Sequence, residues 1–150
     1  MSAGGRAALV AVATVAADQA VKALVRTTID RGEGVDLILG IELVNVRNRG
    51  IAFGMFSGGG VLLVLFAVAA LLALLVFFAR HRDRPLVWLP TGLLIGGATG
   101  NLIDRTREGA VTDFIDLSWW PAFNVADISI TFGVLALLYV LEGPPRHGRR

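Results

Sequence analysis

Four apolar stretches dominate the hydrophobic pattern of the chain. Each contains a window of 19 residues, and the windows run over 7–25, 61–79, 85–103 and 123–141. A helix of about 20 apolar residues crosses the roughly 30 Å hydrocarbon core of a bilayer, so each window is long enough to span a membrane. The second window has no polar side chain and the third has no charge. The pattern predicts a mainly α membrane protein with four transmembrane helices.

The first window also has features of a cleaved signal peptide. Arg6 precedes an alanine-rich run that ends in the small residues Val15–Ala17. The apolar pattern nevertheless continues past Asp18 to Val25, and removal of this segment would leave an odd number of spans. We therefore interpret the window as the first transmembrane helix.

The segment between the first two windows has a different period. Apolar residues alternate with others at Val35, Leu37, Leu39, Ile41 and Leu43, which is the period of a strand. The glycine-rich stretches 30–34 and 57–60 are typical of turns. We expect a small β element in this first outer loop, lying against the outer membrane surface.

The distribution of arginine predicts the orientation. Segments 1–6, 80–84 and 142–150 would share one side of the membrane and hold seven Arg in 20 residues, whereas 26–60 and 104–122 hold six Arg in 54. The denser side is expected to be cytoplasmic, with both termini.

The length fits a single integral membrane domain over 1–150. Its tail, 143–150, is expected to be disordered and to contact anionic lipid.

The amino-acid composition excludes several kinds of functional site. Charged residues make up 17% of the chain and hydrophobic residues 55%, against about 25% charged residues in soluble domains. The chain has no cysteine, which excludes disulfides and thiol nucleophiles, and its two histidines lie in arginine-rich stretches. We expect no metal and no cofactor. The formal net charge of +2 and the lack of a basic patch with interleaved aromatics argue against a nucleic-acid partner.

Ionisable and amide side chains gather at one depth. Such groups are costly inside a span and are candidates for function. Here they occupy the outer ends of three windows: Asp18, Lys22, Asn101, Asp104, Arg105, Asn124 and Asp127. Asp18 and Lys22 are four residues apart and can pair on one helix face. A purely structural alternative is that these groups only hold the helices together.

Asp113 and Asp127 form the most informative pair. Asp113 is expected in the outer loop before the fourth window, and Asp127 one turn into that helix, after Pro121. A loop residue can fold back onto the start of the following helix. Two carboxyls held close in a poorly hydrated site share one proton. One can then hydrogen-bond a carbonyl while the other activates water, as in aspartic proteases.

The chain resembles the bacterial lipoprotein signal peptidases, also called type II signal peptidases. Four blocks carry the resemblance in order along nearly the whole chain: Asp18-Gln19 with Lys22; Asn48-Arg49-Gly50-Ile51-Ala52-Phe53-Gly54; Gly100-Asn101-Leu102-Ile103-Asp104-Arg105 leading into Val111-Thr112-Asp113-Phe114; and Pro121-Ala122-Phe123-Asn124-Val125-Ala126-Asp127. Arg49 fills a variable position. Thr112 stands where the family often has valine and could alter the hydrogen bonding around Asp113.

The resemblance implies an intramembrane aspartic endopeptidase of the bacterial inner membrane. It would remove the signal peptide from diacylglyceryl-modified prolipoproteins, cutting before the lipidated cysteine, at a site near the outer face. Asp113 and Asp127 match the catalytic aspartates. Further matches shape the site or bind substrate (Asn48, Gly50, Asn101, Arg105, Asn124 and Ala126) or are structural polar residues (Asp18, Lys22 and Asp104).

The partners expected are prolipoprotein and membrane lipid. One chain supplies every group that the mechanism needs, so a monomer should suffice. Residues 48–54 could fold over the cleft and clamp the lipid-modified region. Arg105 could pair with an aspartate or with a polar group near the lipid.

Other functions remain possible at this level. A small transporter or proton-conducting subunit would need polar residues through both leaflets, whereas 61–79 offers none. A Ser-Lys hydrolase would pair Lys22 with Ser118 or Ser129, but Asp18 would keep that lysine charged. A scaffold would not need two aspartates beside Asn101 and Asn124.

Overall fold

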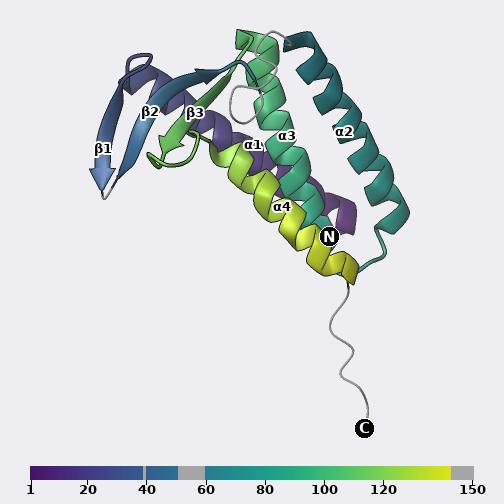
Figure 1. Ribbon diagram of the computed structural model, residues 1–150. Coiled ribbons are helices and arrows are strands. Elements are labelled where there is room, and N and C mark those ends of the chain that lie inside the picture. The colour runs from purple at the N-terminus through teal and green to yellow at the C-terminus, as the bar shows by residue number, and fades with distance from the viewer. Residues whose placement is uncertain (39, 51–59, 143–150) are drawn as a thin grey trace.

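The computed structural model describes residues 1–38, 40–50 and 60–142, and within them it contains helices packed side by side with a small sheet at one end (Figure 1). The elements in chain order are α1 (Ala3–Thr28), β1 (Gly34–Ile38), β2 (Ile41–Asn48), α2 (Gly60–His81), α3 (Trp88–Glu108), β3 (Val111–Asp116) and α4 (Val125–Glu142). The sheet lies beside the end of α1 and the start of α4, which we call the sheet end of the bundle.

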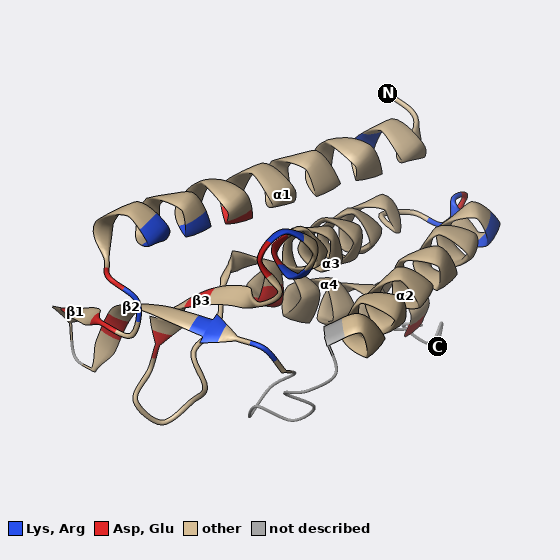
Figure 2. Cartoon of the chain, turned by 90° about the horizontal axis from the view of Figure 1, so that it is seen from above, with Lys and Arg blue, Asp and Glu red and all other residues tan. Residues whose placement is uncertain are grey.

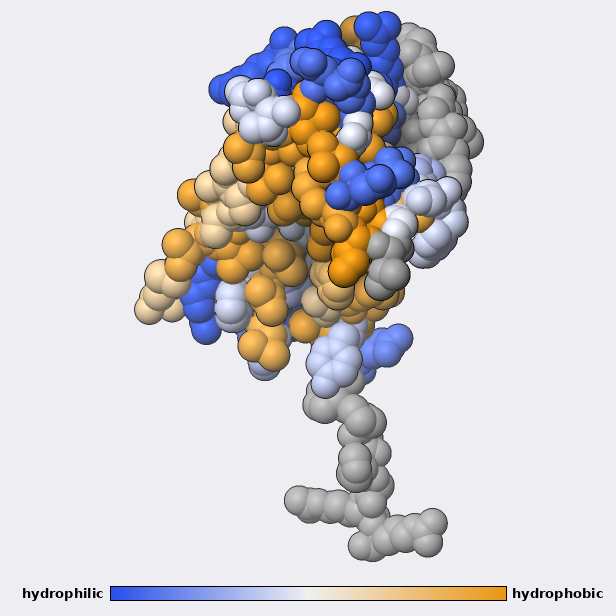
Figure 3. Space-filling model, turned by 90° about the vertical axis from the view of Figure 1, so that its left-hand side faces the viewer, coloured by the Kyte–Doolittle hydropathy of each residue, from blue (hydrophilic) through white to orange (hydrophobic). Residues whose placement is uncertain are grey.

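Three of the described helices, α1, α2 and α4, are long and apolar enough to cross a membrane. Helix α3 corresponds to the third of the four predicted spans, but it is less apolar, because it continues to Glu108 and includes the polar residues after Asn101. It packs against α1, α2 and α4. The buried polar side chains of α3 therefore face other helices. A helix surrounded by other helices can be less apolar than one that faces lipid. Hydrophobic residues cover the middle of the surface seen in Figure 3, and hydrophilic residues gather at one end.

Glycines explain how closely α3 approaches α1. Gly92, Gly96 and Gly100 lie four residues apart and so share one face of α3. A Cβ added at Gly96 would lie 2.6 Å from the Cβ of Thr14, and one at Gly100 would lie 2.6 Å from Oδ2 of Asp18. Small residues let membrane helices approach backbone to backbone. The contact brings the polar face of α1 onto the polar end of α3.

The predicted β element is a three-stranded antiparallel sheet in the order β1-β2-β3. The alternating run over 35–43 is not one strand, because the chain turns at Gly40, whose φ is 79°. Leu39 lies outside the described residues. The prediction that Asp113 lies in a loop is wrong, since it belongs to β3 and pairs with Val46 of β2. The first four residues of β3 are all buried, so no period-two pattern revealed the strand.

The helix ends away from the sheet lie together. The guanidinium of Arg6, near the start of α1, stacks 5.1 Å from the ring centroid of Trp88 at the start of α3. The N-terminus and the end of α4 lie at this same end of the bundle (Figure 1). The predictions for the tail 143–150 and for residues 51–54 lie outside the described residues.

Candidate active site

Asp113 is held by two side-chain amides at the sheet end. Asn48 at the end of β2 donates from Nδ2 to Oδ2 over 2.9 Å, and Asn124 donates from Nδ2 to Oδ1 over 2.7 Å. The residue Asp113 is only 2% exposed. Burial raises the pKa of Asp113 to about 6, the charge of Asp127 also raises it, and the two amide hydrogen bonds oppose the rise. Asp113 therefore retains a proton far more readily than an exposed aspartate.

Asp127 is fixed at the start of α4. Asn101 donates from Nδ2 to its Oδ1 over 2.8 Å, and the backbone N–H of Asn124 donates to its Oδ2 over 3.2 Å. In return the Asp127 backbone N–H donates to Oδ1 of Asn124 over 2.9 Å. This reciprocal pair is a capping box, with an aspartate at its third helical position. The helix cap therefore determines where the carboxyl points.

Asn124 joins the two carboxyls. It is fully buried, and its side chain caps α4 while its amide reaches Asp113. The same amide also donates to Oδ1 of Asn101 over 3.2 Å. Both aspartates line one cavity of about 300 Å³, together with Asn48, Asn101 and Arg105. The site thus combines groups from β2, β3, α3 and α4.

Arg105 takes a partner that the sequence did not suggest. Its Nη2 donates to the backbone carbonyl of Gly50 over 3.3 Å, and the Gly50 N–H donates to Oδ1 of Asn48 over 2.9 Å. Arg105 thereby ties α3 to the segment that follows β2, and it still lines the cavity of the two aspartates.

Thr112 does not touch the carboxyl of Asp113. Neighbouring side chains on a strand point to opposite faces, and the hydroxyl of Thr112 accepts a hydrogen bond from Nη1 of Arg26 over 3.1 Å. The backbone carbonyl of Thr112 accepts over 3.4 Å from the Asn124 amide that also donates to Asp113. An effect of Thr112 on the hydrogen bonding around Asp113 therefore stays a prediction. The backbone N–H of Thr112 donates to Oδ2 of Asp104 over 3.0 Å.

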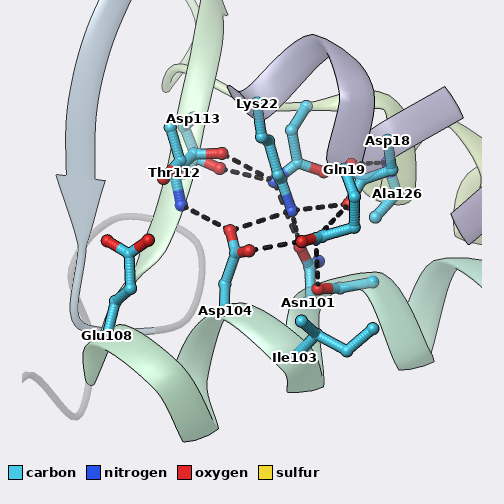
Figure 4. Close-up of polar contacts among 12 residues, drawn as sticks. Asp18, Gln19, Lys22, Asn101, Ile103, Asp104, Glu108, Thr112, Asp113 and Ala126 are labelled. Atoms are coloured by element: carbon cyan, nitrogen blue, oxygen red, sulfur yellow. Dashed lines mark hydrogen bonds and ion pairs between the residues drawn. The ribbon is translucent and has the colours of Figure 1, made fainter. Parts of the chain in front are cut away.

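A buried charge cluster lies beside Asp113 (Figure 4). The ammonium of Lys22 is 2.8 Å from Oδ2 of Asp18 and 3.1 Å from Oδ2 of Asp104, and it donates to Oδ1 of Asn101 over 3.0 Å. The Asp18–Lys22 pair predicted from the spacing is therefore present. Ala126 joins the cluster through its backbone, since its N–H donates to Oδ1 of Asp18 over 3.0 Å. Figure 2 shows charged residues along α1 where it nears the sheet.

Gln19 and Arg26 belong to this charge cluster but were not predicted as site residues. Gln19 donates from Nε2 to Oδ1 of Asp104 over 3.0 Å, and Arg26 forms ion pairs with Asp104 and with Glu108 at 3.6 and 3.1 Å. Arg47 of β2 also pairs with Glu108. The spacing of residues 18, 22 and 26 by four was a usable signal for Arg26, because it continues one helix face.

Two apolar grooves reach Asp127. One, of about 480 Å³, lies among α2, α3 and α4, and it shares Asn101, Arg105 and Asp127 with the polar cavity. The other, of about 370 Å³, is lined by Asp127 and by apolar and aromatic residues that include Trp119, Trp120, Phe123 and Phe132. A molecule with two apolar chains can therefore place one chain in each groove. The atoms that join the two chains would then lie next to Asp127.

The Ser-Lys alternative finds no support in these contacts. Among the described residues, Lys22 is bonded to Asp18, Asp104 and Asn101. The hydroxyl of Ser118 donates to the carbonyl of Gly40, and that of Ser129 donates to the carbonyl of Val125. Within the same described part of the chain, no group of three or more His, Cys, Asp or Glu could hold a metal ion.

The fold and the site define a multi-pass membrane protein with a paired-aspartate site at one end of its helix bundle. The family described as Signal peptidase (SPase) II matches residues 10–142. The chain therefore belongs to the signal peptidase II family, and it is a membrane peptidase.

Individual relatives agree with this membership. The chain is 40% identical over 134 residues to a protein named lipoprotein signal peptidase from Halothermothrix orenii, covering 89% of this chain and 92% of that one. It is 47% identical over 106 residues to one of the same name from Syntrophomonas wolfei, covering 69% and 71%. A solved structure described as a bacterial membrane enzyme superposes with a TM-score of 0.87 at 33% identity, covering 97% of this chain and 93% of the other.

Proposed function

We propose that this peptidase is an intramembrane aspartic endopeptidase that removes the signal peptide from diacylglyceryl-modified bacterial prolipoproteins, cutting before the lipidated cysteine. The observation that carries the proposal is the bridge made by Asn124, which caps Asp127 and donates to Asp113 in one shared cavity. The names of the relatives support the substrate class.

In the proposed reaction the two carboxyls share one proton. We assign that proton to Asp113, from which it is donated to the carbonyl oxygen of the scissile peptide. The ionised carboxylate of Asp127 takes a proton from water, and the water oxygen attacks the carbonyl carbon. When the tetrahedral intermediate collapses, the carbon–nitrogen bond breaks and Asp127 returns its proton to the leaving nitrogen. Asp113 recovers its own proton from the intermediate, so the pair is regenerated.

The two apolar grooves fit the two apolar parts of such a substrate. A prolipoprotein carries a hydrophobic signal segment on one side of the cleaved bond and acyl chains on the other. The groove among α2, α3 and α4 and the groove beside Trp119 and Trp120 both end at Asp127. We propose that they receive these two parts, and that the substrate enters sideways from the lipid.

We further propose that the chain is a single domain with four spans in the bacterial inner membrane. Helix α3 would be the third span, shielded by α1, α2 and α4. Both termini would be cytoplasmic, where arginine is denser, and the sheet end with its aspartates would face outward. Every group in the proposed reaction comes from one chain, which supports a functional monomer.

The test replaces each aspartate by its neutral amide in the full-length protein. Asp113→Asn and Asp127→Asn should each lower cleavage of a diacylglyceryl-modified prolipoprotein by roughly 10²- to 10⁴-fold, the usual contribution of a general acid or base. Asp36→Asn, an exposed residue on β1, is the matched control and should cleave normally. Thermal unfolding in detergent should remain cooperative for all three variants.

The product identifies the substrate class. Mass spectrometry of the mature product should find the lipidated cysteine at its N-terminus, and the unlipidated precursor should stay intact. Normal cleavage by either aspartate variant would overturn the assignment of Asp113 and Asp127 as the catalytic pair. Equal cleavage of the unlipidated precursor would overturn the proposed specificity while leaving the dyad in place.

A further inference from the structure

Lys22 occupies an unusual position for a lysine. Its side chain is fully buried, although lysine is almost never fully buried unless it is paired. Its ammonium has three N–H donors, and it has three acceptors within 2.8 to 3.1 Å, namely Asp18, Asp104 and Asn101. Each donor therefore has one partner, and the three partners are held at a common point (Figure 4).

Two of these partners hold backbone groups next to the paired aspartates. Asp18 accepts the N–H of Ala126, the residue before Asp127, and Asp104 accepts the N–H of Thr112, the residue before Asp113. Both bonds are 3.0 Å long. Because each carboxylate also bonds Lys22, the ammonium links the backbone at the start of α4 to the backbone of β3.

The third partner fixes a side-chain orientation. An ammonium only donates hydrogen bonds, so Asn101 must turn its Oδ1 toward Lys22. Its Nδ2 must then point the other way, where it donates to Oδ1 of Asp127 over 2.8 Å. Asn124 donates to the same oxygen over 3.2 Å, so two donors hold this orientation. Without the lysine, the orientation would depend on the longer bond from Asn124, and the donor to Asp127 would be less firmly fixed.

We propose that Lys22 is a positioning residue for the peptidase reaction, because it fixes Asp18, Asp104 and Asn101 together and so sets how Asp113 and Asp127 face each other. This inference rests on the proposed function of the two aspartates. A merely structural ion cluster would change stability when altered. A positioning residue would change the chemical step and leave substrate affinity largely intact, since it touches neither groove.

The first variant is Lys22→Met, which keeps an unbranched side chain and removes the charge and all three donors. The second is Asp104→Asn, which leaves Lys22 balanced by Asp18 and so avoids an unpaired buried charge. In the native protein Oδ2 of Asp104 bonds both Lys22 and Thr112, and Oδ1 accepts from Gln19. An asparagine has one acceptor oxygen, so it must give up one of these two positions, and it also loses the charge that attracts Lys22. Thr91→Val is the control, because Thr91 is a fully buried polar residue of α3 whose hydroxyl donates to the carbonyl of Val87, on its own helix turn.

The measurements are kcat, KM and the affinity for a peptide inhibitor that carries a hydroxyl in place of the scissile carbonyl. In folded Lys22→Met and Asp104→Asn, kcat should fall roughly 10- to 100-fold, as small misplacements of reacting groups do. KM should stay within about threefold, and inhibitor affinity should fall by a factor similar to that of kcat, because both report the geometry of the dyad. Thr91→Val should keep all three values.

The inference is overturned if folded Asp104→Asn keeps normal kcat and inhibitor affinity, or if only KM changes. Asp104→Asn tests the positioning role of Lys22 even if Lys22→Met does not fold. Asp113→Asn and Asp127→Asn are measured in the same assay. If they are inactive while Asp104→Asn is normal, the positioning role fails and the proposed function stands. If they cleave normally, the proposed function itself fails.

Discussion

The side-chain amide of Asn124 lies 2.7 Å from Oδ1 of Asp113, so a residue that caps helix α4 also holds a carboxyl on strand β3. One side chain thereby performs two separable tasks. Its oxygen accepts the backbone N–H of Asp127, and its nitrogen donates to Asp113. The two tasks can be separated because serine has a cap oxygen and lacks the amide donor.

Asn124→Ser should keep the helix cap and lose the amide donor to Asp113. We expect the unfolding temperature to stay closer to that of the native protein than in Asn124→Ala, which also loses a cap interaction of about 1 kcal/mol. Both variants should lose most of their cleavage activity. Thermal unfolding in detergent and a cleavage assay check the two effects, and an Asn124→Ser variant with native activity would contradict the role of the amide.

The stability of the protein should depend on pH through Asp113. Burial raises the pKa of Asp113 from its ordinary value of 3.8 to about 6, so between these values the folded state binds more protons than the unfolded state. Stability should therefore fall as the pH rises from about 4 to about 6, by up to about 3 kcal/mol for this group. Asp113→Asn should lack this decrease. Identical pH dependence of unfolding in the two proteins would refute the assignment.

The groove among α2, α3 and α4 should bind an apolar part of the substrate. Ala70→Trp places a large side chain on a residue that lines the groove. We expect KM to rise with little change in kcat, because the change blocks binding and leaves the aspartates in place. Ala73→Trp is the matched control, since Ala73 is exposed on the same helix and does not line the groove. Equal effects of the two substitutions would argue against a binding role.

The close approach of α1 to α3 should tolerate no side chain at Gly96. An added Cβ would lie 2.6 Å from the Cβ of Thr14 and 2.8 Å from the carbonyl of Ala11. Gly96→Ala should therefore lower the free energy of unfolding by about 1 to 3 kcal/mol, the usual cost of overpacking. Gly4→Ala is the control, because its Cβ would meet only the hydroxyl of Ser2 at 4.0 Å. Thermal unfolding of both variants gives the comparison.

Some features of the protein follow directly from the order of its residues. The apolar runs specify the helices, because apolar side chains at every turn can be stabilised only in lipid or in a protein core. The spacing of Asp18 and Lys22 specified their pairing, since residues four apart meet on one helix face. The ordered motifs identified the family, and the match over 10–142 confirms it.

The strand that carries Asp113 could not be predicted in the same way. Strand β3 is enclosed by β2 on one edge and by α1 and α3, with which it is also in contact, so polar and apolar residues are buried alike and the alternating pattern is lost. The hairpin of β1 and β2 was hidden for a different reason. Its turn at Gly40 falls within a run of alternating apolar residues, and the alternation resumes after the turn.

The sequence by itself determined which residues are apolar enough for membrane helices, which neighbours pair along one helix, and which family the chain resembles, because these depend on local spacing. Only the tertiary structure decided that Lys22 of α1, Asp104 of α3 and Thr112 of β3 form one connected chain of contacts. The contact between Lys22 and Asp104 joins residues 82 positions apart. Such contacts exist because the glycines of α3 let α1 approach closely enough for buried charges to find partners.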